Sequence, residues 1–248
     1  MRRTVHQVLF DGGPHYGAAV RFSAPRSSAV RLAGLICLLA LLLPAGCAWF
    51  ETKTEASADE LAHRGMRAFE KEKYRKAIEA FQKLRDWYPF SKYAKLAELK
   101  TADGHFHLGE YEEAVFVYEE FESLHPRNEA VPYVIYQIGR CHFQRMEGID
   151  RDQTATRNAL ETFLRLQRTY PDSPYARKAE KPIEKCYENL AGHEFYVGMF
   201  YFKSEHYAPA ASRFQAVLDN YPEGEYHPKA RRYLSLSQAR QKADTSGD

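Results

Sequence analysis

The sequence predicts an all-α fold in which short helix pairs stack in a row, and three observations support this class. A column of apolar residues recurs four times at helical spacing, and each copy ends at a proline 12 residues after an alanine. A second short theme, rich in tyrosine, follows three of these prolines. The composition has 17 Tyr and 15 Phe to build a core, while 14 Gly and 12 Pro are few for a β-sandwich. These features together indicate helix–turn–helix units that share one long core.

The recurring column predicts the second helix of each pair. Its members lie at offsets of 0, 3, 4, 7 and 10 residues, which place them on one face of a helix. The four copies are Tyr74, Ala77, Ile78, Phe81, Leu84 and Pro89; Tyr111, Ala114, Val115, Tyr118, Phe121 and Pro126; Thr156, Ala159, Leu160, Phe163, Leu166 and Pro171; and Tyr207, Ala210, Ala211, Phe214, Val217 and Pro222. Each proline ends its helix because it has no N–H to donate and its ring clashes with the preceding turn.

The theme after the proline predicts the start of the next helix. Residues 88–94, Tyr-Pro-Phe-Ser-Lys-Tyr-Ala, resemble residues 170–176, Tyr-Pro-Asp-Ser-Pro-Tyr-Ala, and residues 221–226 are a looser copy. Ser91 and Ser173 stand where a hydroxyl can accept hydrogen bonds from the free N–H groups of a helix start. We therefore expect both serines to be N-caps.

A small residue, an aromatic residue four positions later and a proline near the end resemble the tetratricopeptide (TPR) pattern. The first unit matches most fully, with Gly65, Ala77, Phe81 and Pro89. In this pattern Ala77 lets its helix approach the partner helix near Gly65, and Phe81 fills the gap beside it. Neither helix buries its apolar face alone, so successive units must stack. The expected fold is a TPR-like solenoid of about five repeats and about ten helices over residues 58–243.

The intervals between the prolines predict where the units differ in length. They are 37, 45 and 51 residues long. The second interval is eight residues longer than the first, and these extra residues fall between the two helices of the third unit, around residues 146–156. In the third interval we expect one long helix from about Pro174 to Phe202, bent at Gly192. A final helix from about Tyr226 to Lys242 caps the array, and residues 244–248 form a disordered tail.

The N-terminus has the composition of an export signal. An apolar run of about a dozen residues, Leu32 to Leu43, follows Arg21, Arg26 and Arg31. Such a run is too short to span a bilayer, which takes about 20 apolar residues, but it fits a signal peptide over residues 1–46. The first 30 residues are long for the basic segment of such a signal, which indicates a start site assigned too far upstream.

The signal ends in Pro44-Ala45-Gly46-Cys47, which resembles the bacterial lipobox, although Pro44 stands where Leu is preferred. The resemblance implies a diacylglycerol on the Cys47 sulfur, further acylation of the new N-terminus, and a tether over residues 47–57. Ala48 after the cysteine implies sorting to the outer membrane. The alternative is an ordinary signal peptide with an incidental cysteine. Cys37 is a poor lipidation site because bulky residues precede it.

Signal, repeats and insert together resemble the BamD family, the lipoproteins of the β-barrel assembly machinery. The more specific matches are residues 88–90 with Tyr93, and three segments: 131–139 (Val-Pro-Tyr-Val-Ile-Tyr-Gln-Ile-Gly), 150–153 (Asp-Arg-Asp-Gln) and 190–194 (Leu-Ala-Gly-His-Glu). The resemblance implies a scaffold on the periplasmic face of the outer membrane. It also implies binding to a POTRA domain of the barrel subunit BamA, to unfolded outer-membrane proteins and to other lipoproteins of the complex.

The resemblance implies one partner-binding residue, and the repeat pattern suggests a groove. Arg213 matches a family arginine that pairs with an acidic residue of the barrel subunit; the alternative is a solvated helix charge. An extended peptide can lie along a surface of such a solenoid. Residues of the first helices of units two and three that could face it are Tyr93, Lys100, Tyr136 and Arg140. For each of these four, ordinary packing or solvent exposure is the competing interpretation.

No residue pattern indicates catalysis, a metal or a cofactor other than the acyl lipid on Cys47. Cys141 and Cys186 fit no metal-site spacing, and we interpret them as buried thiols, with a disulfide as the alternative. His105 and His107 point to different sides of a helix, and adjacent glutamates such as Glu112 and Glu113 diverge around one. A net charge of +2 provides no concentrated basic face for nucleic acid. The sequence therefore predicts a protein that is not an enzyme.

Two other functional classes are alternatives to this scaffold. Cell-envelope coordinators of the CpoB type, which act with the Tol-Pal system, have similar Tyr-Pro-x-Ser-x-Tyr-Ala repeats, but they usually carry an N-terminal coiled coil and no lipobox. No heptads are visible between Cys47 and Ser57. An enzyme or enzyme subunit acting on peptidoglycan needs a catalytic constellation, and the sequence contains none that we recognise.

Overall fold

The computed structural model describes residues 55–246. The predicted signal peptide (1–46), the lipidation site Cys47 and most of the tether lie outside these residues. Ten helical segments and no strand occupy the described range. They are α2 (Ala58–Glu70), α3 (Tyr74–Trp87), α4 (Ala94–His107), α5 (Tyr111–Leu124), α6 (Val131–Gln144), α7 (Thr154–Thr169), α8 (Pro174–Lys178), α9 (Glu180–Lys203), α10 (Tyr207–Asn220) and α11 (Tyr226–Ser246). None of these helices is long and apolar enough to cross a membrane.

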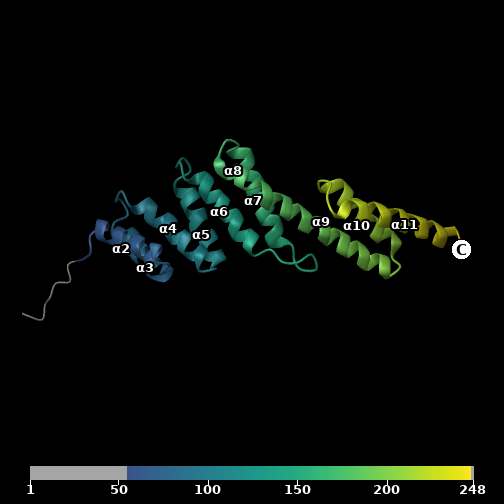
Figure 1. The fold of residues 1–248 in the computed structure, drawn as a ribbon, viewed down its shortest axis with the longest axis horizontal. Coiled ribbons are helices and arrows are strands. Elements are labelled where there is room, and N and C mark those ends of the chain that lie inside the picture. Colours follow the sequence, from purple (N-terminus) through teal and green to yellow (C-terminus); the bar gives the residue numbers. More distant parts are fainter. Residues whose placement is uncertain (1–54, 247–248) are drawn as a thin grey trace, which may run out of the picture. The chain divides into compact units, whose positions relative to one another are not determined.

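Each helix packs against its neighbours in the chain, which is the expected arrangement of stacked pairs (Figure 1). Helices α2 to α7 form three successive antiparallel pairs. Helix α9 then packs on α7, α10 and α11. The predicted all-α, TPR-like fold is confirmed. The four recurring columns lie on α3, α5, α7 and α10, as the proline intervals indicated.

The core of each pair centres on the aromatic residue of the column. Phe81, Tyr118, Phe163 and Phe214 are all buried, as are the four alanines four residues before them. In three pairs the ring lies directly on a glycine of the first helix: Gly65 beneath Phe81, Gly139 beneath Phe163 and Gly198 beneath Phe214. A methyl group at Gly139 would lie 2.5 Å from the ring of Phe163, and one at Gly198 would lie 2.6 Å from that of Phe214. The glycines therefore set how closely the two helices approach.

The second pair differs at this position. Ala102 stands where the other pairs have glycine, and both Ala102 and the corresponding Tyr118 are buried in one cluster. Tyrosine replaces phenylalanine here, so this core must also hold a hydroxyl group. That hydroxyl donates a hydrogen bond to Asp103 of α4 and so belongs to a buried polar network.

One of the two predicted N-caps is present and the other is wrong. The Ser173 hydroxyl accepts a hydrogen bond from the Tyr175 N–H (3.2 Å) and caps α8. Pro174 follows directly, and its fixed φ starts the helix at that residue. After Ser91 the chain makes one more turn and α4 begins only at Ala94, so the Ser91 hydroxyl is buried without a hydrogen-bond partner. Ser57 forms a full capping box with Glu60 at the start of α2, which the sequence reading did not identify.

The predicted bend of the long helix at Gly192 is also wrong. The interruption lies at Ala179, between α8 and α9, and α9 is continuous through Gly192. The cause is Pro182, which has no N–H for the carbonyl of Lys178 and would clash with it in a regular helix. The final helix runs to Ser246, so residues 244–246, assigned to the tail, belong to α11.

We predict that the glycine–aromatic contact cannot accept a methyl group. Gly139→Ala should lower the free energy of unfolding by about 1–3 kcal/mol, because the new Cβ displaces the buried Phe163 ring. The matched control is Gly224→Ala, where the nearest atom to the new Cβ is 3.8 Å away. Urea denaturation followed by circular dichroism measures both. Equal stability of the two variants would show that the ring does not depend on the glycine.

Candidate functional site

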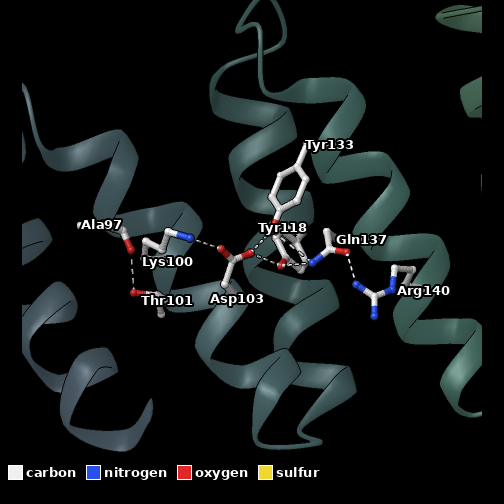
Figure 2. Close-up of polar contacts among 8 residues, drawn as sticks. All are labelled: Ala97, Lys100, Thr101, Asp103, Tyr118, Tyr133, Gln137 and Arg140. Atoms are coloured by element: carbon white, nitrogen blue, oxygen red, sulfur yellow. Dashed lines mark hydrogen bonds and ion pairs between the residues drawn. The ribbon is translucent and has the colours of Figure 1, made fainter. Parts of the chain in front are cut away.

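A buried polar network joins α4, α5 and α6 and includes two of the four predicted groove residues (Figure 2). At its centre is Asp103 of α4, whose side chain is only 5% exposed. The carboxylate accepts hydrogen bonds from the hydroxyls of Tyr118 (2.5 Å) and Tyr133 (2.5 Å). It also pairs with the Lys100 ammonium at 2.8 Å. Three donors therefore satisfy a charge that would be costly to bury alone.

The network continues from the tyrosines to Arg140. The Gln137 amide donates to the hydroxyls of Tyr118 and Tyr133, each at 3.2 Å. Its carbonyl oxygen accepts a hydrogen bond from the Arg140 guanidinium at 3.0 Å. Figure 2 shows Lys100 and Arg140 at opposite ends of this chain, with Asp103 and the tyrosines between them.

Burial and the neighbouring Asp103 carboxylate keep the tyrosine hydroxyls protonated. Burial, which is the larger effect, and the charge of Asp103 both raise the pKa of Tyr118 and that of Tyr133 well above the ordinary range. Both hydroxyls thus remain donors to the carboxylate at neutral pH. The effect of the arrangement is to fix the positions of two cations, Lys100 and Arg140.

The structure brings only some of the predicted groove residues together. Arg140 lies over the ring of Phe106, 4.4 Å from its centroid, and is 6.0 Å from the centroid of Tyr136. Tyr136 therefore adjoins the Arg140 end of the network. Tyr93 belongs to a different contact, since its hydroxyl donates to Asp59 of α2 at 2.5 Å.

The sequence reading missed the centre of the network, which consists of Asp103, Tyr118, Tyr133 and Gln137 as hydrogen-bonding groups. A signal was available, because Asp103 follows the alanine that replaces the pair's glycine, and Tyr118 replaces phenylalanine in the same unit. A polar residue on each of the two helices of one pair indicates a buried hydrogen bond between these helices.

A second cluster joins the insert of the third unit to α9. Asn189 donates to the Glu147 carbonyl (3.1 Å) and to the Gln153 side chain (2.8 Å). His193 is 2.8 Å from the Ile149 carbonyl oxygen. A methyl group at Gly192 would lie 2.7 Å from the Ile149 side chain. The insert therefore packs closely on α9, and two segments that the sequence singled out separately, 150–153 and 190–194, meet here.

Arg213, the predicted partner-binding residue, lies on α10 and pairs with Glu194 of α9 at 2.9 Å. The Arg213 side chain is 45% exposed and that of Glu194 is 19% exposed. The hydrogen bond to Glu194 raises the pKa of the guanidinium, so its charge is constant. The pair orients Arg213 while leaving donor groups of the guanidinium accessible to solvent.

The remaining candidate groups are buried or contact other residues of the fold. Cys141 and Cys186 are free and buried, and burial raises the pKa of each thiol to about 12. His105 contacts Glu110, which lowers the pKa of that carboxylate, whereas His107 stacks on Tyr74. In the described part of the chain, no group of three His, Cys, Asp or Glu side chains could hold a metal ion.

These features define a TPR-type repeat protein whose conspicuous polar clusters position charged side chains and hold its elements together. A family model described as YfiO, outer membrane lipoprotein, matches residues 54–244. The chain therefore belongs to the YfiO family. This match confirms the BamD resemblance, because the curated relatives that the chain matches carry that name.

The relatives are outer membrane protein assembly factors named BamD. The protein of Caulobacter vibrioides is 28% identical, over 75% of this chain and 63% of the relative. That of Rickettsia prowazekii is 32% identical over 65% and 64%, and that of Vibrio cholerae is 26% identical over 76% and 83%. The chain thus spans somewhat under two thirds of the first two relatives. The names describe assembly factors, not enzymes, in agreement with the sequence prediction.

We predict that the network contributes to stability through its buried hydroxyl. Tyr118→Phe should lower the free energy of unfolding by about 1–3 kcal/mol, since Asp103 loses a buried donor. Tyr93→Phe is the matched control, because it removes an equally short Tyr–Asp hydrogen bond at an exposed site and should cost less than about 1 kcal/mol. Chemical denaturation compares the two; equal costs would argue against burial as the source of the effect.

Proposed function

We propose that this protein is a lipid-anchored scaffold on the periplasmic face of the outer membrane that assists the assembly of β-barrel proteins. The family match over residues 54–244 carries the proposal. The sequence Pro44-Ala45-Gly46-Cys47 supplies a candidate attachment site for the lipid. The names of the relatives, outer membrane protein assembly factors, support the cellular role over that of a Tol-Pal coordinator.

In this proposal the C-terminal helices bind a POTRA domain of a BamA-type barrel subunit through Arg213. Glu194 holds the guanidinium in place, so little side-chain entropy is lost when a partner carboxylate binds. Arg213 lies on α10, which packs on both α9 and α11. A partner that contacts Arg213 would thus bind a side chain whose helix is held by two neighbouring helices.

The N-terminal repeats, in the same proposal, receive segments of unfolded outer-membrane proteins. Lys100 and Arg140 are cations held at fixed positions by the Asp103 network. Tyr136 provides an aromatic ring next to Arg140. Fixed cations beside aromatic rings suit an extended peptide that carries a carboxylate and aromatic side chains. Other lipoproteins of the complex are further proposed partners.

The anchor can be tested by substitution of the two N-terminal cysteines. We predict that Cys47→Ser abolishes acylation and moves the protein from the membrane to the soluble fraction, because several acyl chains supply the anchorage. Cys37→Ser is the control and should leave acylation intact. Mass spectrometry of the mature N-terminus reads out both variants. A lipid retained by the Cys47→Ser variant would refute Cys47 as the attachment site.

The partner contact can be tested at Arg213. Arg213→Glu should reduce recovery of a BamA-type barrel in a pull-down at least about tenfold, since it reverses the charge offered to the partner. Arg231→Glu is the control, because Arg231 is another exposed arginine of the C-terminal helices, paired with Glu223 at 2.7 Å. Circular dichroism verifies that both variants fold. Recovery unaffected by Arg213→Glu, or lowered equally by Arg231→Glu, would contradict a specific role.

A further inference from the structure

The connections that follow the four recurring prolines differ in chemistry along the chain. Two residues before each proline stand Trp87, Leu124, Thr169 and Asn220 in turn. One residue after each proline stand Phe90, Arg127, Asp172 and Glu223. The first two connections are thus apolar and basic, whereas the last two are polar and acidic at the same repeat positions. The repeat fold itself does not require this difference, because all eight side chains are exposed.

The apolar side chains of the first two connections are unusually open to solvent. Phe90 is 101% exposed, Leu124 is 61% exposed and Trp87 is 48% exposed. Exposed cations accompany them at Lys92, Lys95 and Arg127. We call these six residues the loop patch: Trp87, Phe90, Lys92, Lys95, Leu124 and Arg127. Large apolar side chains grouped with cations on a surface are typical of an interaction site.

The two connections belong to one surface. Lys95, at the start of α4, lines the same cleft as Leu124 and Arg127. His125, next to Leu124, is 2.8 Å from Glu98 of α4. Exposed acids flank the patch at Asp86 and Glu129, in addition to this paired Glu98. Asp86 lies 3.5 Å from Arg85, which offsets its charge. The loop patch itself contributes three positive charges and no negative charge.

The described chain begins beside this patch. The Tyr88 hydroxyl, between Trp87 and Phe90 in sequence, donates to the Ala56 carbonyl at 3.2 Å. Tyr93 likewise binds Asp59 at the start of α2. Cys47 precedes Ala56 by nine residues, which can span at most about 32 Å. A lipid on Cys47 would therefore hold the loop patch within reach of the membrane.

We propose that the loop patch lies against a phospholipid surface that contains anionic headgroups. This inference rests on the proposed lipid anchor at Cys47. The rings of Trp87 and Phe90 suit the interfacial region of a bilayer, where aromatic side chains concentrate. Each cation near an anionic surface adds attraction that falls off within a Debye length. The third and fourth connections have no large apolar side chain at the equivalent positions, so the contact is confined to the N-terminal repeats.

Fluorescence quenching by brominated lipid tests the contact directly. The full chain is produced in bacteria that acylate lipoproteins and carries Trp49→Phe, so that Trp87 is its only tryptophan. It is reconstituted into phosphatidylethanolamine vesicles with about a quarter brominated phosphatidylglycerol. We expect Trp87 emission to fall by about half or more relative to vesicles without bromine. Lys92→Glu with Lys95→Glu and Arg127→Glu should abolish most of this loss.

The matched control moves the tryptophan to the equivalent position of the third connection. This variant carries Trp49→Phe, Trp87→Phe and Thr169→Trp, and its emission should not fall. Flotation of each sample with the vesicles separately reports the anchor. In one outcome the chain floats while Trp87 is quenched no more than the tryptophan at position 169. That result would overturn the membrane contact of the loop patch but not the lipid anchor, and would favour a protein as the partner of the patch. A chain that does not float refutes the anchor, and the inference falls with it.

Discussion

The structure depends on an aromatic ring placed directly on a residue that has no side chain. Phe81, Phe163 and Phe214 each cover a glycine of the partner helix, and none of these contacts leaves room for a methyl group. The ring fills the gap that the glycine opens, so the two helices of a pair have one preferred distance. Because a single pair buries too little surface to be stable, this contact must recur before the array can fold.

The second pair has an altered form of this contact, and the alteration brings polar groups into the core. Tyr118 carries a hydroxyl where Phe81 and its counterparts carry none, and that hydroxyl needs a partner. Asp103 supplies it and in turn needs Tyr133 and Lys100. The polar network therefore acts together with apolar packing to fix the position of α6. The same bonds that satisfy the buried carboxylate also hold Lys100 and Arg140 in place.

Repeat spacing predicted the helix order well because period and proline position are properties of the local sequence. The buried columns on α3, α5, α7 and α10 follow from spacing alone. The errors arose where one residue overrides the pattern: Pro182 breaks the helix at Ala179, and Lys92, where the other copy has Pro174, delays the start of α4 beyond Ser91. The network around Asp103 was missed because Tyr118, Tyr133 and Gln137 follow Asp103 by 15, 30 and 34 residues and share no spacing rule with it. Arg213 was identified by resemblance, but its pairing with Glu194 needed the structure.

The continuity of α9 has a mechanical consequence. This helix has 24 residues, so it is about 36 Å long. Its first half packs on α7 and the insert, and its second half packs on α10. An unbroken helix resists twisting, so its halves turn together. A force applied to α9 near Glu194 would therefore be transmitted to the hydrogen bonds of Asn189 and His193 with the insert.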